Sequence, residues 1–124
     1  NRITDYPAST MDIFPTVAEI LKLPKSSMTS PIDGISLTEL FKSDLKSREK
    51  PIPFRWQNKA ALVDNNFKLI ETDISKNEFE LYDLSKDPRE ETDISDQHPK
   101  RVAEMEAIMR EAHTDPTIGR MCAP

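Results

Sequence analysis

Apolar residues in the middle of the chain recur at every second position, which restricts this region to β-structure. The alternation runs through "FRWQNKAALV", "FKLIET" and "EFELYDL", between residues 54 and 84. The tripeptide Asp64-Asn65-Asn66 separates the first two segments, and Asn and Asp tolerate the positive φ of a tight turn. Short polar connections between such segments predict an antiparallel meander of three to four strands.

A helical pattern precedes the predicted sheet. In residues 10–23, apolar side chains recur at helical spacing on one face, namely at Ile13, Phe14, Val17, Ile20 and Leu21. Thr10 or Asp12 is placed to cap this helix, and Pro15 falls in its first turn, where a missing N–H costs little. Pro24 is expected to end it. The apolar face must be buried against another surface.

A second helical pattern follows the sheet over residues 98–113. Its apolar stripe consists of Val102, Met105, Ile108, Met109 and Ala112. Pro99 suits the first helical position. The sheet cannot bury its apolar side alone, so this helix should cover one face. The predicted fold class is therefore α+β: a small antiparallel sheet of three to four strands with a C-terminal amphipathic helix packed on it, plus the N-terminal helix.

Composition limits the classes of partner. The chain of 124 residues carries 22 acidic and 17 basic residues, for a net charge of −5, which argues against a nucleic-acid surface. No run of 18 apolar residues exists, so no membrane-spanning helix is expected. The opening "NRITDYPAST" shows no initiator Met and no targeting pattern, and we expect it to continue from a preceding segment. A single cysteine, Cys122, excludes an internal disulfide.

The acidic stretch that begins at Asp83 looks at first like a calcium loop. An EF-hand loop starting there would place Ser85 and Asp87 at its third and fifth positions. The sixth position holds Pro88 instead of Gly, and the twelfth holds Ile94 instead of Glu. The stretch is therefore interpreted as the end of a strand followed by a turn on Asp87 and Pro88, with its acids at the surface.

Few other residues are candidates for chemistry. His98 and His113 lie at opposite ends of one predicted helix, too far apart to share a metal, and they fit helix-end roles better than catalysis. No Gly-x-Ser-x-Gly elbow and no glycine-rich phosphate loop occurs. Arg55 and Trp56 are neighbours on a predicted strand, so they point to opposite faces. Trp56 is the better core residue, which leaves Arg55 for solvent, a partner domain or a bound anion.

Five blocks of the sequence, taken in order, resemble the C-terminal end of type I sulfatases (arylsulfatases). That family typically shows Asp-Ile-x-Pro-Thr, Asp-Gly-x-Ser-Leu, Ala-x-Arg-x-Gly-x-Trp-Lys-Leu, Glu-Leu-Tyr-Asp-Leu-x-x-Asp-Pro-x-Glu and a helix led by His-Pro. The corresponding blocks here are residues 12–16, 33–37, 60–69, 80–90 and 98–113, which cover nearly the whole chain. The third block departs from the pattern. Phe67 replaces Trp and keeps an aromatic plug, whereas the family's Arg has no counterpart, so no substrate contact is carried over.

The resemblance implies a hydrolase of sulfate esters whose catalytic centre lies upstream of residue 1. Such enzymes resemble alkaline phosphatase in a large N-terminal α/β domain. That domain carries calcium and a formylglycine made in a Cys/Ser-x-Pro-x-x-Arg motif. Residues 1–49 would be the last helix and linker of that domain, and residues 50–124 the C-terminal subdomain, with no catalytic or metal-ligating residue of its own. The end "CAP" at residues 122–124 spells only part of the motif and is interpreted as coincidence.

The same resemblance implies partners and a location. Arg55 would lie on the rim of the substrate cleft, and a sulfated sugar or aryl sulfate would be the substrate. The chain's own N-terminal catalytic domain would be its main partner, and the helix of residues 10–23 could pair two isolated copies. The resemblance to this family also implies a periplasmic, secreted or lysosomal protein. Two alternatives stay open: a stand-alone binding or scaffolding module with this fold, and part of a phosphate or phosphonate monoesterase of the same superfamily.

Overall fold

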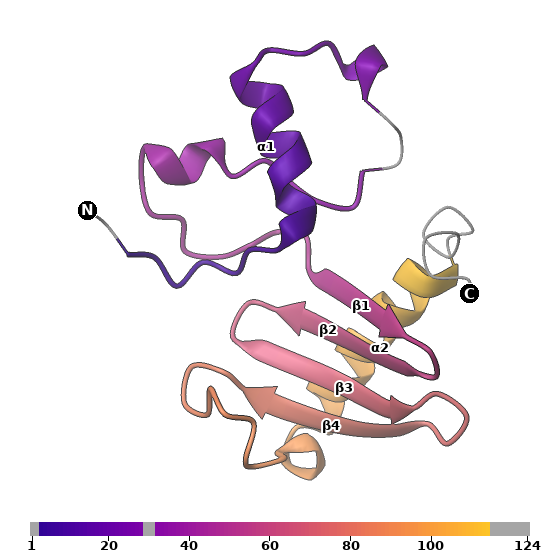
Figure 1. The fold of residues 1–124 in the computed structure, drawn as a ribbon. Coiled ribbons are helices and arrows are strands. Elements are labelled where there is room, and N and C mark those ends of the chain that lie inside the picture. The colour runs from indigo at the N-terminus through magenta and orange to yellow at the C-terminus, as the bar shows by residue number, and fades with distance from the viewer. Residues whose placement is uncertain (1–2, 29–31, 115–124) are drawn as a thin grey trace. The chain divides into compact units, whose positions relative to one another are not determined.

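The computed structural model describes residues 3–28 and 32–114, and the chain divides into two compact units, Asn1–Lys50 and Pro51–Pro124. The first unit contains the 3-10 helix η1 (Thr10–Asp12), the helix α1 (Ile13–Ile20), and the 3-10 helices η2 (Lys25–Ser27) and η3 (Thr38–Phe41). The second contains the strands β1 (Ile52–Trp56), β2 (Lys59–Asp64), β3 (Phe67–Asp73) and β4 (Glu78–Asp83), the 3-10 helix η4 (Ser95–Gln97) and the helix α2 (Pro99–Thr114) (Figure 1).

The first helix starts from a reciprocal cap. The Ser9 side chain accepts the Met11 N–H, and the Asp12 carboxylate accepts the Ser9 N–H at 2.8 Å. Ser9 is therefore the N-cap of η1, and Asp12 supplies the returning half of the capping box. Asp12 occupies the N-cap position of α1, one of the two predicted positions, but its side chain makes no capping bond to that helix. Pro15 lies in the first turn of α1, as predicted.

The same helix ends before the predicted proline stop. Lys22 adopts the left-handed region with φ 53°, and the Leu23 N–H then bonds the Ala18 carbonyl at 2.9 Å. This reversal is the usual way in which a helix satisfies its last carbonyls. Pro24 follows a helix that has already turned.

The sheet is a four-stranded antiparallel meander in the order β1-β2-β3-β4. This confirms the predicted α+β class, and the sheet has four strands, the larger of the two predicted numbers. The prediction of residues 54–63 as one continuous strand is wrong, because the chain reverses at Gln57 and Asn58. Gln57 has φ 54° and Asn65, in the next turn, also has φ 54°. The sequence signal at Gln57 is weak, since Gln favours such a turn far less than Asn or Gly.

The core of the second unit lies between the sheet and α2, which crosses behind the strands in Figure 1. It is formed by residues that are almost fully buried: Ala60, Leu62, Leu69, Leu81, Met105 and Met109. Cross-strand register explains why the sheet residues meet, because Leu62 pairs with Leu69 and Leu69 with Leu81. The predicted helix-on-sheet packing is confirmed. Within the described ranges, no helix has the length and apolar character needed to cross a membrane.

Two arginines join α2 to the sheet at separate points. Arg101 bonds the Asp64 carboxylate at 2.7 Å, and Arg110 bonds that of Glu71 at 3.3 Å. Each guanidinium also lies over an aromatic ring, at 5.2 and 5.9 Å from the centroids of Phe67 and Phe79 respectively. Glu71 is 2% exposed, so its charge depends on Arg110 for compensation. Cation–π contact and ion pairing therefore fix the helix along with the apolar core.

Candidate functional site

Arg55, the residue predicted for a cleft rim, lies on the edge strand β1. It pairs with Ala60 in the register of β1 and β2, and its side chain is exposed. Within the described part of the chain, its guanidinium makes no hydrogen bond or ion pair. The group is therefore available to an anion, which is the property that a rim residue needs.

Trp56, predicted as the core partner of Arg55, is 73% exposed, and this prediction is wrong. The register gives the reason. Arg55 lies opposite Ala60, which packs under α2, so alternation turns Trp56 to the other face of the sheet. There it pairs with Lys59 as the last residue before the turn. An assignment by residue type alone, in which Trp goes inside and Arg outside, does not locate the helix-covered face.

The acidic stretch after β4 uses its carboxylates to hold its own backbone. Asp83 accepts the N–H of Ser85 at 3.1 Å and the Lys86 ammonium at 2.7 Å. Asp87 accepts the N–H groups of Glu91 and Thr92, each at 2.9 Å. These bonds are those of turn-forming aspartates, as the interpretation from sequence expected, and they occupy the oxygens that a metal would need.

Hydrogen bonds from backbone N–H groups also lower the pKa values of two carboxyl groups in this stretch, Asp87 and Asp93. The Thr92 and Glu91 N–H groups lower the pKa of Asp87 below its usual value. For Asp93, partial desolvation pushes the pKa upward, but the N–H groups of Leu81 and Ser95 outweigh it and leave the pKa lowered. Both groups stay ionised at neutral pH, as acceptors of backbone N–H groups rather than proton donors.

The remaining predicted candidates supply no catalytic group within the described residues. His98 is exposed and lies one residue before α2, where its carbonyl accepts the Val102 N–H at 3.1 Å, so it has the helix-start role that was predicted. The side chain of His113 lies outside the described residues, as does the whole of Cys122. In residues 3–28 and 32–114, no three His, Cys, Asp or Glu side chains gather closely enough to hold a metal ion.

A buried ion pair in the first unit was not predicted. Arg48, in a polar stretch of the predicted linker, is 3% exposed and donates to both oxygens of Asp12, at 2.8 and 2.9 Å. The same carboxylate accepts the N–H of Ser9 at 2.8 Å and that of Ile35 at 2.8 Å. Burial pushes the pKa of Asp12 upward, but the hydrogen bonds from Arg48, Ile35 and Ser9 outweigh it, and the pKa is lowered.

Residues 12–16 and 33–37, the first two blocks that resemble the family, are therefore linked by the bond from the Ile35 N–H to the Asp12 carboxylate. A second link is made by Thr16, whose hydroxyl donates to the Asp12 carbonyl at 2.6 Å and accepts the Leu37 N–H at 2.9 Å. Gly34 permits this approach, because a Cβ there would lie 2.0 Å from the Met11 carbonyl oxygen. The Asp-Ile-x-Pro-Thr and Asp-Gly-x-Ser-Leu blocks thus join two chain segments that lie more than 20 residues apart in the sequence.

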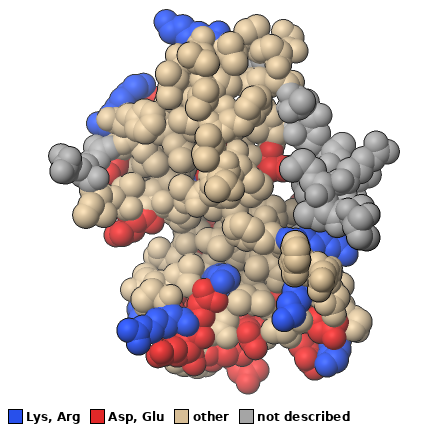
Figure 2. Space-filling model, in the orientation of Figure 1, with Lys and Arg blue, Asp and Glu red and all other residues tan. Residues whose placement is uncertain are grey.

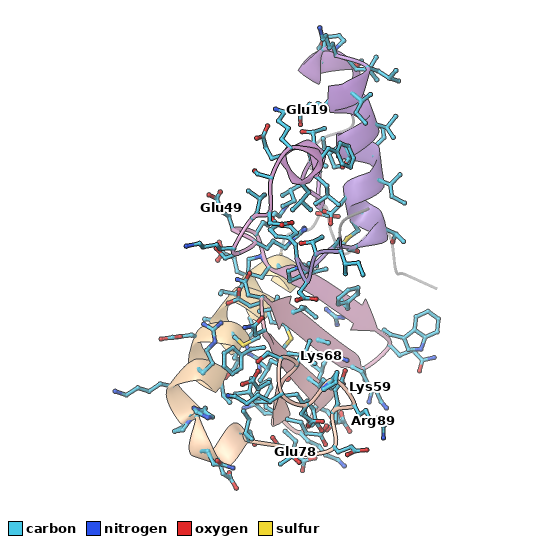
Figure 3. The ribbon with its side chains drawn as sticks, turned by 90° about the vertical axis from the view of Figure 1, so that its left-hand side faces the viewer. Glu19, Glu49, Lys59, Lys68, Glu78 and Arg89 are labelled. Atoms are coloured by element: carbon cyan, nitrogen blue, oxygen red, sulfur yellow. The ribbon has the colours of Figure 1, made fainter. Side chains whose placement is uncertain are left out.

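The third and fourth blocks are linked in a similar way. The Lys68 ammonium binds both oxygens of Glu90 at 2.7 Å, and Figure 3 shows Lys68 on the side of the sheet away from α2. Tyr82 pairs with Lys68 across the strands and donates its hydroxyl to Glu80 at 3.0 Å. Burial and the Glu80 carboxylate raise the pKa of Tyr82 to about 12, so this phenol stays protonated. In these two blocks, the residues that resemble the family therefore stabilise the fold through contacts with one another.

The known proteins that this chain is similar to include several sulfatases. Among curated proteins, an N-acetylgalactosamine-6-O-sulfatase of Bacteroides thetaiotaomicron is 31% identical over 119 residues, covering 86% of this chain and 23% of its own length. No family model matches the chain.

Solved structures give the same result. One, from work on the metabolism of multiple glycosaminoglycans by Bacteroides thetaiotaomicron, is 31% identical with a TM-score of 0.66, covering 83% of this chain and 24% of that one. Another, described as a 2-O GAG sulfatase, has a TM-score of 0.66 at 21% identity over 83% of this chain and 24% of its own, a likeness that shows the fold alone. The chain spans about a quarter of the length of these relatives.

Proposed function

From the match between this chain and the C-terminal region of type I sulfatases, we propose that it forms the C-terminal part of an enzyme that hydrolyses sulfate esters. The observation that carries the proposal is the 31% identity to a sulfatase over nearly the whole chain, together with a shared fold. The role of these residues is to brace the enzyme and shape its substrate cleft, since their matching blocks form hydrogen-bonded and ion-paired links.

Calcium and formylglycine are the cofactors that the resemblance implies. The described residues do not fit a calcium ion, because no three carboxylate, imidazole or thiol side chains gather among them. We propose that both groups lie in a preceding catalytic domain, as the resemblance implies, where they would supply the charge stabilisation and the nucleophile of ester hydrolysis. No step of the chemistry is assigned to residues of this chain.

A sulfated sugar fits better than an aryl sulfate as the substrate. The curated relative is named for a 6-O-sulfated amino sugar. Arg55 supports this assignment as a rim residue, because its exposed guanidinium has the geometry to bind a sulfate or carboxylate group of a glycan. Such substrates lie outside the cell or in degradative compartments, which agrees with an exported or lysosomal protein.

Sulfate release from N-acetylgalactosamine 6-sulfate tests the proposal directly. The protein that includes the segment before Asn1 should release sulfate, whereas the 124-residue chain alone should release none. Cys122→Ala in the longer protein should leave turnover unchanged, which provides the control for the partial motif. Hydrolysis of phosphate monoesters in place of sulfate esters would contradict the proposal and support the phosphatase alternative. Turnover by the short chain would place the catalytic centre within it and contradict the assignment.

The exposed face of α1 supports the catalytic domain as the partner. Ile13, Val17 and Ile20 recur at helical spacing and are 61%, 45% and 56% exposed. Figure 2 shows a largely uncharged surface over the first unit. A continuous aliphatic stripe of this kind marks a protein contact, because a soluble surface rarely leaves such a patch in water. In the longer protein the preceding domain covers it, and in the isolated chain a second copy does.

Light scattering coupled to size-exclusion chromatography should show a mass that rises with concentration for the isolated chain. Replacing Ile13, Val17 and Ile20 together with Gln should hold the mass at that of one chain. Phe41→Gln is the matched control, since Phe41 is equally apolar and 68% exposed but lies outside α1. A wild-type chain that stays monomeric at every concentration would contradict the pairing of copies.

A further inference from the structure

The tip of the β1–β2 hairpin, defined here as residues 54–59, presents aromatic side chains to solvent. Trp56 is 73% exposed and Phe54 is 47% exposed, whereas Ile52, two residues earlier on the same face, is 2% exposed. The face thus changes from buried to open along one strand. Trp and Phe bury large apolar areas in most proteins, so a strand end that leaves both open is suited to contact with a ligand.

Two cations without partners flank these rings. Lys59 pairs with Trp56 in the register and so shares its face, on the side of the sheet away from α2, where Figure 3 labels it. Arg55 lies between Phe54 and Trp56 on the opposite face. Neither cation forms a hydrogen bond or ion pair through its side chain with any residue in the described ranges. Residues 51–63 contain no acid, in a chain whose net charge is −5.

The turn at the tip is also tied by hydrogen bonds to the turn between β3 and β4. Asn58 donates its amide to the Asp73 carboxylate at 3.2 Å, and its carbonyl accepts the Ile74 N–H at 2.8 Å. Ser75 also bonds Asp73, at 2.7 Å through its hydroxyl, and together these bonds hold the pKa of Asp73 below its usual value. The Asp73 carboxylate, the one bonded to the tip among residues 3–28 and 32–114, is therefore also engaged with the adjoining turn. Pre-organisation of this kind lowers the entropy lost on binding.

We propose that this tip is a contact site for the sulfated sugar chain, a role that rests on the function proposed above. The indole face of Trp56 stacks against the C–H face of a sugar ring, and Lys59 on the same face binds a sulfate group of the sugar chain. Arg55 binds a second sulfate group where the sugar chain passes the open edge of β1. A protein partner fits less well. Covering Lys59 and Arg55 would desolvate two charges, whereas the apolar stripe of α1 meets a protein surface without that loss.

Trp56 is the only tryptophan of the chain, so its emission reports on the tip directly. A chondroitin 6-sulfate hexasaccharide added to the 124-residue chain should shift or quench this emission to saturation, and its desulfated counterpart should not. Lys59→Gln and Arg55→Gln should each weaken binding about two- to fivefold, as expected for single exposed ion pairs. Lys100→Gln is the matched control, because Lys100 is an exposed cation on α2, and it should leave binding unchanged.

The aromatic contact is tested by calorimetry, because Trp56→Ala removes the fluorescent probe. Trp56→Ala should weaken binding of the hexasaccharide about tenfold, and Trp56→Phe should retain most of it. Phe41→Ala, an exposed aromatic in the other unit, should have no effect. Equal binding of the sulfated and desulfated sugars, or no binding of either, would overturn the proposal.

Two further outcomes separate this proposal from the catalytic one. If the longer protein releases sulfate from the monosaccharide while the hexasaccharide leaves Trp56 emission unchanged, the contact site is overturned and the sulfatase function stands. If the hexasaccharide binds the tip while the longer protein releases no sulfate, the contact site stands and the sulfatase function falls. Protection of Trp56 from hydroxyl-radical oxidation in the longer protein without sugar, read by mass spectrometry of its peptide, would identify the tip as a domain interface and overturn the proposal.

Discussion

Replacing Asp12 with alanine is expected to lower the free energy of unfolding by about 3–5 kcal/mol, because it leaves the buried Arg48 guanidinium without its anion. The Arg48 and Asp12 side chains are 1% and 0% exposed, so water cannot take the place of the lost carboxylate. The same change removes the acceptor for the N–H groups of Ser9 and Ile35. One substitution thus removes bonds to two other segments of the first unit, the one at Arg48 and the one at Ile35.

Urea unfolding followed by far-ultraviolet circular dichroism measures this loss. Glu39→Ala is the matched control: it breaks an ion pair of similar length, 2.7 Å to Lys42, whose side chains are 59% and 71% exposed. That pair should contribute little, because solvent already screens it. Equal losses for Asp12→Ala and Glu39→Ala would show that burial of the Arg48 pair does not determine its contribution.

Acid should reproduce the effect of the substitution. The pKa of Asp12 is lowered in the folded chain, so its ionised form contributes stability that is fully present above the unfolded value of 3.8. This contribution is lost as the pH falls below 3.8 and through the folded pKa. The difference in unfolding free energy between the wild type and Asp12→Asn should therefore narrow in that window and stay constant above it. A difference that is the same at every pH would contradict the linkage.

Met105→Ala is expected to lower the unfolding free energy by about 2–5 kcal/mol, through lost burial and the cavity left behind. Met105 is fully buried in the cluster that includes Leu62, Leu69 and Leu81. Alanine is the best helix former, so α2 itself is not weakened by the change. The loss therefore measures how strongly the helix is packed on the sheet.

Ile108→Ala on the same helix provides the comparison for this core residue. Ile108 is 36% exposed, and its truncation should lower the unfolding free energy by about 1 kcal/mol. Both variants can be measured by urea unfolding at one temperature. A loss for Met105→Ala no larger than for Ile108→Ala would show that α2 packs less tightly on the sheet than its buried residues indicate.

The sequence predicted those elements of the fold whose pattern is local. Helical spacing identified α1 and α2, and alternation together with Asp64-Asn65-Asn66 identified the β2–β3 hairpin. The β1–β2 turn was not found because Gln57 carries little preference for positive φ, and tertiary pairing rather than local propensity places it there. The error on Trp56 has the same origin, since the covered face depends on where α2 lies and not on the strand itself.

The candidate site was less predictable because its contacts are long-range. Arg48 lies in a polar stretch that is typical of a solvated loop, and only its pairing with Asp12, 36 residues earlier, makes it structural. The matching blocks gave the resemblance to sulfatases but not their physical role. That role emerges from partners in different blocks, such as Thr16 with Leu37 and Lys68 with Glu90. Arg55 was identified correctly as an exposed cation, whereas the importance of its aromatic neighbour was not.

The two arginines of α2 have a mechanical consequence. Arg101 and Arg110 are nine residues apart, which at 3.6 residues per turn places them about 180° around the helix axis from each other. They therefore contact the sheet from opposite sides of the helix, Arg101 at Asp64 and Arg110 at Glu71. Rolling the helix toward either flank would stretch one arginine contact while the other resists, and sliding it lengthwise would break both. High salt should loosen the ion pairs, but the rings of Phe67 and Phe79 would still seat the guanidinium groups.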